Sequence, residues 1–507
     1  MPPPEARVSA ALAIDRESIC PNFVNGQWVA PRSLEALERR NPADPREIVG
    51  YAALSTRAEV REAVAAAMQA LPAWRAQPAP RRGRILANAA RRLEDHREDL
   101  ARLLTREEGK TVGESRGELA RAINTLDYIA GEARRLTGET LPSELLHNFV
   151  YTFRQPLGVV GLITPWNFPV AVPVWKLAPA LVCGNTVVWK PSEITPLCSR
   201  RVVEVLVEAG LPHGVLNMVN GLGEEAGDEL VEHPAVEAIS FTGSNAVGAI
   251  INAKAARQFK KVQLEMGGKN PAVVLEDADL ELAAEHTVMG AFGSAGERCT
   301  ATSRVVVVEP VADRFVELVA ARASALRVGD PLDPATQVGP LVSREQFEKV
   351  LIYLELGKRE ARLVCGGGRA PMPDGLGGYF IQPTVFDRVL AGSRLAQEEI
   401  FGPVLAVIRV RDFEEALAVA NGVRYGLTAS IFTTDANRIF QAAERLECGM
   451  VHINSPTVGG EAHVPFGGIK GTGCGERESG STAIDFYSEL KVVYVDYTGQ
   501  KRDGNLY

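Results

Sequence analysis

The sequence predicts an α/β fold with two units, the first of them built on a doubly wound parallel sheet. Between Leu157 and Glu265, short apolar runs alternate with helical stretches. Continuous apolar strands that are separated by helices are typical of a parallel sheet covered on both faces. A second series of strands and helices begins near Pro271 and continues to about residue 455. These observations together predict two α/β units in one chain.

The spacing of apolar residues assigns the elements in chain order. From Arg57 to Leu104 these residues recur every three or four positions, which predicts helices, and a break at Pro78 to Pro80 divides them. The strands of the first sheet are predicted over 158–163, 186–189, 215–219, 238–241 and 262–264. The second series opens with strands over 271–275 and 304–308 and contains glycine-rich turns at 366–368 and 375–378.

The tail contains one further predicted strand. The stretch from Val492 to Tyr497 is mostly apolar, which predicts an edge strand or a strand that pairs with another copy. A second strand-like segment, Phe149 to Arg154, could pair with the tail of a partner. Because an exposed apolar strand near a terminus invites aggregation, we expect both segments to be covered in a homodimer or homotetramer. The alternative is that the tail pairs within its own chain.

Composition and charge exclude several classes of partner. The chain has 507 residues, 46% hydrophobic and 23% charged, which is ordinary for a globular protein of two or three domains. Its net charge of -8 predicts that neither nucleic acid nor an anionic membrane is a partner. No segment approaches the roughly 20 apolar residues that span a bilayer, and residues 1–20 lack the basic start and apolar core of a secretory signal.

The cysteines and histidines predict a cytoplasmic, metal-free protein with reduced thiols. The seven cysteines are scattered and form no CxxC pair, so neither a disulfide framework nor a zinc ribbon is indicated. The seven histidines show neither HxxxH nor HxH spacing. One reduced thiol is therefore a candidate for chemistry.

Three segments indicate a nucleotide site, each with a structural alternative. Gly221 to Gly227 contains Gly223 but lacks the spacing of a dinucleotide fingerprint and fits a simple turn. Phe241 to Gly248 ends a strand and opens a helix, where glycines let a pyrophosphate approach free N–H groups, or it forms only a structural strand–helix turn. Lys190 and Glu193 follow a strand end and could bind the hydroxyls of a ribose, or form a solvated ion pair.

Seven motifs in a fixed order carry a resemblance to a known family. From about Phe23 to the tail, the chain resembles the aldehyde dehydrogenase superfamily. The motifs are Leu162–Pro169, Lys190–Glu193, Phe241–Ser244, Leu264–Pro271, Gly296–Thr300, Glu398–Pro403 and Pro465–Lys470. The resemblance implies an NAD(P)-binding domain over 21–137 and 157–264, a catalytic domain over 265–483, and oligomerisation segments over 138–156 and 484–507.

The resemblance also implies catalytic roles for five residues. Cys299 matches the nucleophile, whose thiol adds to the aldehyde so that the oxyanion of the thiohemiacetal can expel a hydride. Asn167 matches the side-chain donor to that oxyanion. Glu265 matches the base that activates water to hydrolyse the thioester. Lys176 and Glu478 match a pair that passes the proton toward solvent, although a plain buried salt bridge fits them equally well.

Cofactor binding is implied for residues in both units. Lys190 and Glu193 resemble the ligands of the adenosine ribose, and a carboxylate at 193 favours NAD because it would repel the 2′-phosphate of NADP. Relatives with this residue can accept both cofactors, so NADP stays possible. The full set is Thr164, Pro165, Trp166, Lys190, Glu193, Gly223, Gly243, Ser244, Glu399 and Phe401.

Two alternatives to this hydrolytic enzyme remain, and the substrate is open. A CoA-acylating relative would lack the base at position 265, which is present here, and a binding protein without activity would not need Cys299 and Asn167. The loop 455–464, where relatives contact the substrate, has no arginine that could bind a carboxylate. Its opening nevertheless resembles that of 2-oxoglutarate semialdehyde dehydrogenases, which makes this semialdehyde the leading specific candidate beneath a general aldehyde.

Two features near the nucleophile depart from the commonest pattern. Glu297 stands where glutamine is frequent, and its charge would raise the pKa of the thiol if it pointed inward, so we expect it to point away. Ala171 and Val172 are small, which predicts a roomy entrance.

Overall fold

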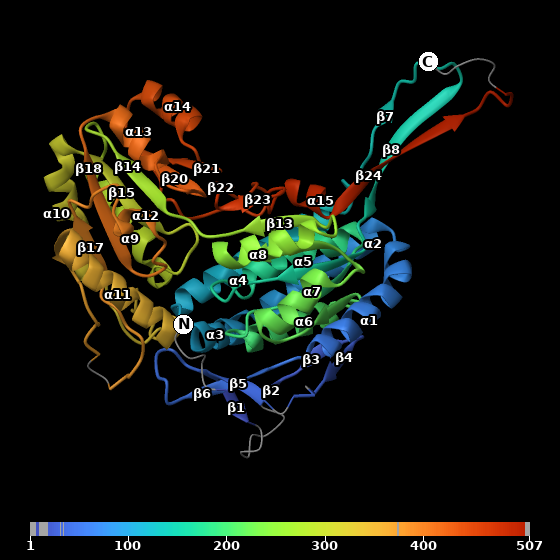
Figure 1. Ribbon diagram of the computed structural model, residues 1–507, viewed down its shortest axis with the longest axis horizontal. Coiled ribbons are helices and arrows are strands. Elements are labelled where there is room, and N and C mark those ends of the chain that lie inside the picture. Colours follow the sequence, from blue (N-terminus) through green and yellow to red (C-terminus); the bar gives the residue numbers. More distant parts are fainter. Residues whose placement is uncertain (1–6, 10–18, 31, 34, 373–374, 502–507) are drawn as a thin grey trace.

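Two large, mostly parallel sheets lie beside each other in the computed structural model, and a narrow arm projects from one of them (Figure 1). The structure describes residues 7–9, 19–30, 32–33, 35–372 and 375–501. Part of the N-terminal stretch therefore lies outside the described residues. What is described of it forms β1 (Arg7–Ser9), paired with β5 (Glu35–Arg40), and β2 (Ile19–Cys20), paired with β6 (Ile48–Ala53).

The first large sheet has eight strands, in the order β23-β13-β12-β9-β10-β11-β3-β4. Five central strands are mutually parallel, and β3, β4 and β23 run antiparallel to their neighbours at the two edges. The strands are β3 (Asn22–Val24), β4 (Gln27–Val29), β9 (Val159–Ile163), β10 (Thr186–Lys190), β11 (Leu216–Met218), β12 (Val236–Thr242), β13 (Lys261–Glu265) and β23 (Gly473–Cys474).

Helices cover both faces of this sheet, as a doubly wound fold requires. On one face, the alternate residues Val159, Val188 and Ile239 pack against α1, α7 and α8. On the other, Val160, Val187 and Trp189 pack against α5 and α6, with α2, α3 and α4 behind them. The helices are α1 (Arg57–Arg75), α2 (Ala79–Asp95), α3 (Arg97–Glu108), α4 (Val112–Glu132), α5 (Ala171–Cys183), α6 (Pro196–Glu208), α7 (Asp228–Glu232) and α8 (Asn245–Ala256), with a π-turn η2 (Gly223–Gly227) before α7.

The second large sheet has seven strands, in the order β16-β17-β18-β15-β14-β20-β21, and only β16 runs antiparallel. Its strands are β14 (Asn270–Val274), β15 (Thr302–Val308), β16 (Arg362–Cys365), β17 (Thr384–Asp387), β18 (Val404–Val410), β20 (Thr428–Phe432) and β21 (Met450–Ile453). Successive residues of β15 face opposite sides, so Val305 packs with α9 and α10 while Val306 packs with α13. Its helices are α9 (Leu280–Phe292), α10 (Glu309–Ala325), α11 (Arg344–Glu360), α12 (Arg394–Gln397), α13 (Phe413–Asn421) and α14 (Ala436–Arg445), and β19 (Tyr425–Gly426) pairs with β22 (Ile469–Lys470) beside it.

The arm is a three-stranded antiparallel sheet in the order β24-β8-β7 (Figure 1). After α15 (Thr482–Phe486), the tail strand β24 (Ser488–Asp496) pairs over nine residues with β8 (Asn148–Pro156), which also pairs with β7 (Thr140–Leu141). Both segments predicted as strands are therefore strands. The expectation that the tail pairs with this segment of another copy is wrong, because the pairing occurs within one chain. Backbone pairing inside the chain satisfies the groups that a free β8 edge would leave open.

Every strand predicted for the two large sheets is present, and so is the helical region from Arg57. The proline break separates α1 from α2, since Pro78 precedes the first turn of α2. One connection crosses the expected boundary: β23, far along the chain, adds to the first sheet beside β13. It brings the segment around residue 473 against Glu265.

Candidate active site

Most of the predicted cofactor residues lie at one edge of the first sheet, while Glu399 and Phe401 come from the second unit. Residues 164–167 follow β9, Lys190 ends β10, Ser244 follows β12 and Glu265 ends β13. Because these strands are parallel, their carboxyl ends meet at the same edge. After β9 the chain first builds outward on one side through β10 and then returns to the other side with β12, so β9 stands at a topological switch point, where open α/β sheets bind ligands.

Cys299 comes from the second unit, on a tight loop between α9 and β15. The loop begins with the short 3-10 segment η3 (Gly293–Gly296), in which Ser294 and Ala295 both have a φ of 50°. Left-handed backbone is strained for residues with a side chain and persists only where surrounding contacts hold it. At Ser294 such a contact comes from Glu114, whose Oε1 accepts a hydrogen bond from Ser294 N. Farther along the loop, Asn270 Nδ2 donates to the carbonyl oxygens of Cys299 at 2.8 Å and Ala301 at 2.9 Å.

A cavity of about 270 Å³ joins the two units at Cys299. It brings together eight of the predicted site residues: Pro165, Trp166, Asn167, Gly243, Ser244, Cys299, Glu399 and Phe401. Trp166 and Phe401, from different units, meet edge to face with ring centroids 5.5 Å apart. Val172, Trp175 and Phe466 supply apolar walls near the nucleophile.

Asn167 is buried, and its side-chain amide donates to the carbonyl oxygen of Glu297 at 3.0 Å. Glu297 lies two residues before the nucleophile. An amide nitrogen carries two hydrogens, so the second stays available to an oxyanion formed on a substrate at Cys299. The arrangement suits an oxyanion donor that is held in place before the reaction.

The Cys299 side chain is an undissociated thiol in this environment. Burial, together with the charges of Glu265 and Glu399, raises its pKa to about 12, against a lowering contribution from Arg121. Since the thiolate is the attacking form, the thiol must lose its proton as it adds to a carbonyl.

Glu265 is buried at the end of β13, close to the glycines of the 465–470 motif. A Cβ at Gly467 would stand 2.4 Å from Glu265 Oε1, so only glycine allows this approach. Among the described residues none offers a hydrogen bond to Glu265 Oε2. Burial and the neighbouring Glu478 carboxylate raise the pKa of Glu265 well above its usual value, despite opposing charges from Lys176 and Arg477. A buried, partly unsatisfied carboxyl with a raised pKa has the properties of a general base.

Lys176 and Glu478 form a buried ion pair directly behind Glu265. Lys176 Nζ also donates to Ser240 Oγ at 2.8 Å, and Ser240 Oγ donates to Gln263 Oε1 at 2.8 Å. The pair does not line the cavity at Cys299. Its closeness to Glu265 fits a proton path, and its hydrogen bonds fit a structural salt bridge, so both interpretations of the sequence stay open.

The remaining predicted cofactor residues lie away from Cys299. Lys190 Nζ donates to Glu193 Oε2 at 3.3 Å and to the carbonyl oxygens of Pro191 at 2.7 Å and Gly221 at 2.8 Å. Glu193 is one third exposed, so its carboxylate can accept further hydrogen bonds. Gly223 faces open space, with no atom within 4 Å of a Cβ built there. Thr164 is buried and accepts a hydrogen bond from Trp189 Nε1 at 2.8 Å.

These residues fit a dinucleotide. Ser244 caps α8 and leaves N–H groups at the start of that helix, the ordinary place for a pyrophosphate. At the other end, Glu399 accepts a hydrogen bond from Gly268 N at 2.9 Å and lines the cavity at Cys299. A Cβ at Gly267 would lie 2.2 Å from Glu399 Oε2, so this glycine is required for the approach. The residues that fit a dinucleotide thus extend from Glu193, at the edge of the first sheet, to Glu399, which lines the cavity at the Cys299 thiol.

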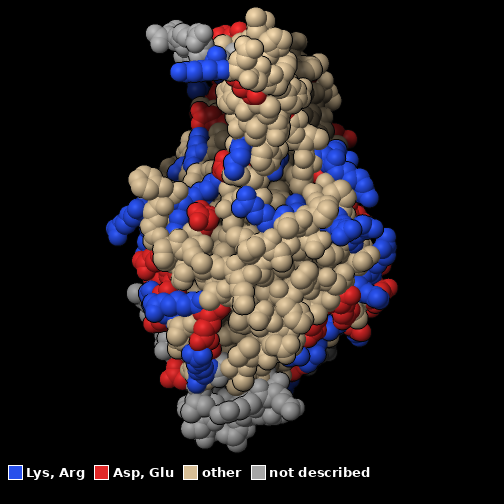
Figure 2. All heavy atoms as spheres, turned by 90° about the vertical axis from the view of Figure 1, so that its right-hand side faces the viewer, with Lys and Arg blue, Asp and Glu red and all other residues tan. Residues whose placement is uncertain are grey.

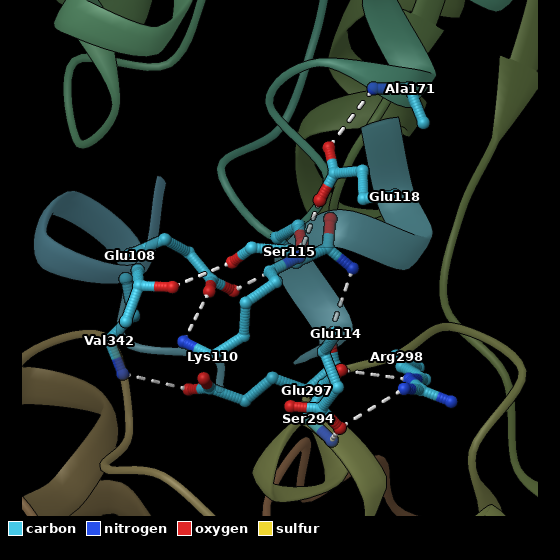
Figure 3. A network of polar contacts seen from close by, with 12 residues as sticks. Glu108, Lys110, Glu114, Ser115, Glu118, Ala171, Ser294, Glu297, Arg298 and Val342 are labelled. Carbon is cyan, nitrogen blue, oxygen red and sulfur yellow. Dashed lines mark hydrogen bonds and ion pairs between the residues drawn. The ribbon is translucent and has the colours of Figure 1, made fainter. Parts of the chain in front are cut away.

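Glu297 points away from the thiol, as expected. Its Oε1 accepts a hydrogen bond from Val342 N at 3.2 Å (Figure 3). Burial, together with the Glu108 carboxylate, raises the pKa of Glu297 well above its usual value. Arg298, next to the nucleophile, is also turned aside: its Nη2 lies 3.3 Å from Glu114 Oε1 and its Nε donates to Ser294 Oγ at 3.0 Å (Figure 3).

Sequence reasoning missed one basic side chain that lines the cavity. Arg121, on α4, stacks on Trp175 with its Cζ 4.2 Å from the ring centroid. The loop 455–464 does lack an arginine, but Gly460 of that loop packs against Arg121, since a Cβ there would lie 2.6 Å from Arg121 Nη2. In the sequence, Arg121 is one arginine of a helical stretch with no motif around it, so nothing marks it as a site residue. Only the packing of α4 against α5 places it at the site.

Within the ranges that the structure describes, no group of three or more His, Cys, Asp or Glu side chains could hold a metal ion. In the same part of the chain, no helix has the length and apolar character needed to cross a membrane.

Comparisons with known proteins identify the family of the chain. A model of the aldehyde dehydrogenase family matches residues 28–493. The alpha-ketoglutaric semialdehyde dehydrogenase of Bacillus subtilis is 46% identical over 475 residues, which cover 94% of this chain and 97% of the relative.

Two solved structures share the whole architecture. Betaine aldehyde dehydrogenase from Staphylococcus aureus, in complex with NAD+, superposes with a TM-score of 0.92 at 35% identity and is matched over 95% of both chains. An NADP dependent enzyme from E. coli superposes with a TM-score of 0.91 at 37% identity, over 95% of this chain and 99% of that one. The resemblance seen in the motifs and the predicted fold class are therefore confirmed. The chain belongs to the aldehyde dehydrogenase family and is an oxidoreductase that acts on aldehydes with a nicotinamide cofactor.

Proposed function

We propose that the protein oxidises its aldehyde through a covalent intermediate on Cys299 and releases the acid by hydrolysis. One observation carries this proposal: the Cys299 thiol and the Asn167 amide share one cavity, while the unsatisfied Glu265 carboxyl lies close enough to raise the pKa of the thiol. The presence of the Glu265 carboxyl favours water over CoA as the acceptor of the acyl group. Intact nucleophile, donor and base also argue against a binding protein that has lost activity.

In the proposed mechanism, Cys299, Asn167 and Glu265 act one after another. Cys299 gives up its proton to solvent as its sulfur adds to the carbonyl carbon. Asn167 stabilises the oxyanion of the thiohemiacetal. A bound NAD(P)+ would supply the acceptor for the hydride that leaves this carbon, and Cys299 would then hold the same carbon as the carbonyl of a thioester. Glu265 then removes a proton from water, whose attack frees the acid and a thiolate that takes up a proton from solvent to restore the thiol. The Lys176–Glu478 pair offers a route for that proton toward solvent.

The cofactor is held by residues 21–137 and 157–264, and the segment 265–483 carries the nucleophile. Glu193, Lys190 and the start of α8 bind its adenosine half, and Glu399 with Phe401 binds the nicotinamide ribose. Glu193 favours NAD, because its carboxylate accepts hydrogen bonds from a ribose hydroxyl and repels a 2′-phosphate.

Glu193→Ser is expected to lower the preference for NAD over NADP by about tenfold to a hundredfold, since it removes both a charge-assisted hydrogen bond and the repulsion. The measurement is the ratio of kcat/KM for the two cofactors at one aldehyde concentration. Glu224→Ser removes an equal charge from a nearby exposed position and should leave the ratio unchanged. A wild-type enzyme that already prefers NADP strongly would contradict this assignment.

A more specific candidate is an aldehyde with a carboxylate at its far end, such as 2-oxoglutarate semialdehyde. The Arg121 guanidinium supports it, because it lines the cavity of Cys299 and has no carboxylate within ion-pair distance in the described part of the chain. Burial lowers the pKa of Arg121 to about 10, which still leaves a cation at neutral pH. A half-buried cation that no carboxylate pairs with favours an anionic ligand. The name of the Bacillus subtilis relative points to the same class of substrate.

Arg121→Met should lower kcat/KM for 5-oxopentanoate by about tenfold to a hundredfold, the size of a lost hydrogen-bonded charge pair, and leave that for pentanal nearly unchanged. The two substrates share a chain length and differ in the carboxylate. Arg116→Met, on the same helix but paired with Glu98 at the surface, controls for the loss of net charge. Equal losses for both aldehydes would show that Arg121 supports the site without binding a carboxylate.

We further propose a homodimer or homotetramer that buries the arm. All seven cysteines lie in the described part of the chain as free thiols, which supports a cytoplasmic location for the protein.

The proposed assembly rests on the exposed face of the arm. Leu490, Val492 and Tyr494, on one face of β24, are 56%, 48% and 71% exposed. Figure 2 shows the arm rising at the top of the molecule with few charged side chains on its near face. A closed two-fold assembly would cover this surface, although β24 pairs within its own chain.

Replacing Val492 and Tyr494 together by lysine is expected to yield a smaller assembly, because it puts charge on the proposed interface and leaves the backbone pairing with β8 intact. Light scattering after size exclusion measures the mass. Phe259→Lys, at a fully exposed position far along the chain, is the control. Deletion from Lys491 onward removes most of β24 and should give a monomeric or insoluble product. An unchanged mass in the double variant, or a soluble active monomer from the truncation, would contradict the proposal.

A further inference from the structure

A cluster of charged side chains is buried behind the cavity, between the start of α4 and the start of α5. Its members are Glu108, Lys110 and Glu118, and the side chains of Lys110 and Glu118 are 1% and 0% exposed. Lys110 Nζ lies 2.7 Å from Glu118 Oε2 and 3.8 Å from Glu108 Oε1. None of the three lines the cavity, and none belongs to the roles described above.

Lys110 reaches the backbone of the residue that we assign as oxyanion donor. Its Nζ donates to the carbonyl oxygen of Asn167 at 2.5 Å and lies 4.1 Å from the ring centroid of Phe168. Burial would lower the pKa of Lys110, but the carboxylates of Glu108 and Glu118 outweigh it and raise the pKa above its usual value. The side chain is thus an ammonium, a stronger donor than a neutral group.

Glu118 holds the other end of the same segment. Its Oε1 accepts hydrogen bonds from Val170 N at 2.8 Å and Ala171 N at 3.0 Å, and Figure 3 shows the carboxyl directed at Ala171. These N–H groups stand at the start of α5, where a helix leaves its first donors without partners. A carboxylate there also complements the positive end of the helix.

The segment 167–171 is therefore fixed at three points. Lys110 binds its first carbonyl, Glu118 binds its last two N–H groups, and the Asn167 side chain reaches the carbonyl of Glu297. Burying an ion pair costs more than packing apolar residues of similar volume in many proteins, so its stabilising effect alone does not explain its presence. Displacing a reacting group by about 1 Å can cost on the order of a hundredfold in rate, which gives precise placement a large effect.

We infer that Lys110 and Glu118 are positioning residues that set the place of the Asn167 amide at the nucleophile. They act through Asn167 and touch neither substrate nor cofactor. This inference rests on the role proposed for Asn167. It predicts that either residue matters for the reaction only while the Asn167 amide is present.

A double-mutant cycle on hydride transfer under single-turnover conditions tests it, with Lys110→Met, Asn167→Ala and the combination. Asn167→Ala should slow NADH formation by about 10²–10³, and Lys110→Met by about tenfold to a hundredfold. The combined variant should be no slower than Asn167→Ala within about twofold, because the positioned group is already gone. The dissociation constant for NAD should stay at the wild-type value in all three.

Glu118→Gln provides a second cycle, and it carries the test if Lys110→Met does not fold. Glu107→Gln is the matched control, because Glu107 is as deeply buried and caps α6 in the same way, accepting from Leu197 N and Cys198 N at 2.8 Å. It should change the melting temperature but not the rate of hydride transfer. Full additivity of Lys110→Met or Glu118→Gln with Asn167→Ala overturns the inference. A wild-type rate in Asn167→Ala instead overturns the proposed role of Asn167.

Discussion

Cys299→Ala is expected to abolish both the oxidation of aldehydes and the hydrolysis of activated esters, with a loss on the order of 10⁴-fold or more. The reason is that the sulfur forms each covalent intermediate of both reactions. NAD should still bind, because Lys190, Glu193, Ser244 and Glu399 hold it. NADH formation at 340 nm, ester turnover without cofactor and NAD titration give the three readouts.

A matched control separates this loss from a general effect of removing a thiol. Cys365 is partly buried like Cys299 but lies on β16, at the far edge of the second sheet. Cys365→Ala should keep both activities. Dehydrogenation above background in Cys299→Ala would remove Cys299 from the mechanism, and loss of NAD binding would show that the substitution disturbs the cofactor site as well.

Glu265→Gln should stall the steady state while sparing the first turnover. Hydride transfer precedes the step that needs water, so one equivalent of NADH per active site should still appear. Steady-state turnover should then fall by about 10²–10⁴, the usual contribution of a general base. Stopped-flow absorbance at 340 nm records both phases in one experiment.

The pH dependence follows from the raised pKa of Glu265. Only the ionised carboxylate can take a proton from water, and burial with the Glu478 charge shifts its ionisation to higher pH. Steady-state turnover in the wild type should therefore rise with pH over a range higher than that in which an ordinary glutamate ionises. In Glu265→Gln that rise should disappear from the hydrolysis step. Glu237→Gln, on the neighbouring strand β12 and exposed, should keep the wild-type profile. Unchanged turnover in Glu265→Gln would mean that another group activates the water.

Local sequence was sufficient for most of the fold. Apolar runs such as 158–163 and 186–189 lie on strands buried on both faces, and a strand of that kind needs apolar residues at every position. The proline break at 78–80 also acts locally, because proline is favoured in the first turn of a helix. The family motifs predicted the residues around the cavity because most of them stand at strand ends, where the sequence pattern and the site coincide.

Long-range contacts lay beyond that kind of reasoning. β24 pairs with β8 across more than 300 positions of sequence, and an apolar strand fits its own chain or a partner equally well until its neighbours are known. Arg121 and Lys110 belong to helical and turn segments without a motif, so nothing adjacent in sequence marks them.

The sequence by itself determined the two α/β units, the strands of both sheets and the candidate nucleophile, donor and base, since these depend on periodicity and on motifs of a few residues. Only the tertiary structure decided that Arg121 lines the cavity of Cys299 and that Glu297 accepts a hydrogen bond from Val342. It also decided that Lys110 and Glu118 bind the backbone of the segment that contains Asn167. The physical reason is that a charged side chain acts at the distance of a hydrogen bond. Packing of α4 against α5, which depends on the whole core, sets that distance.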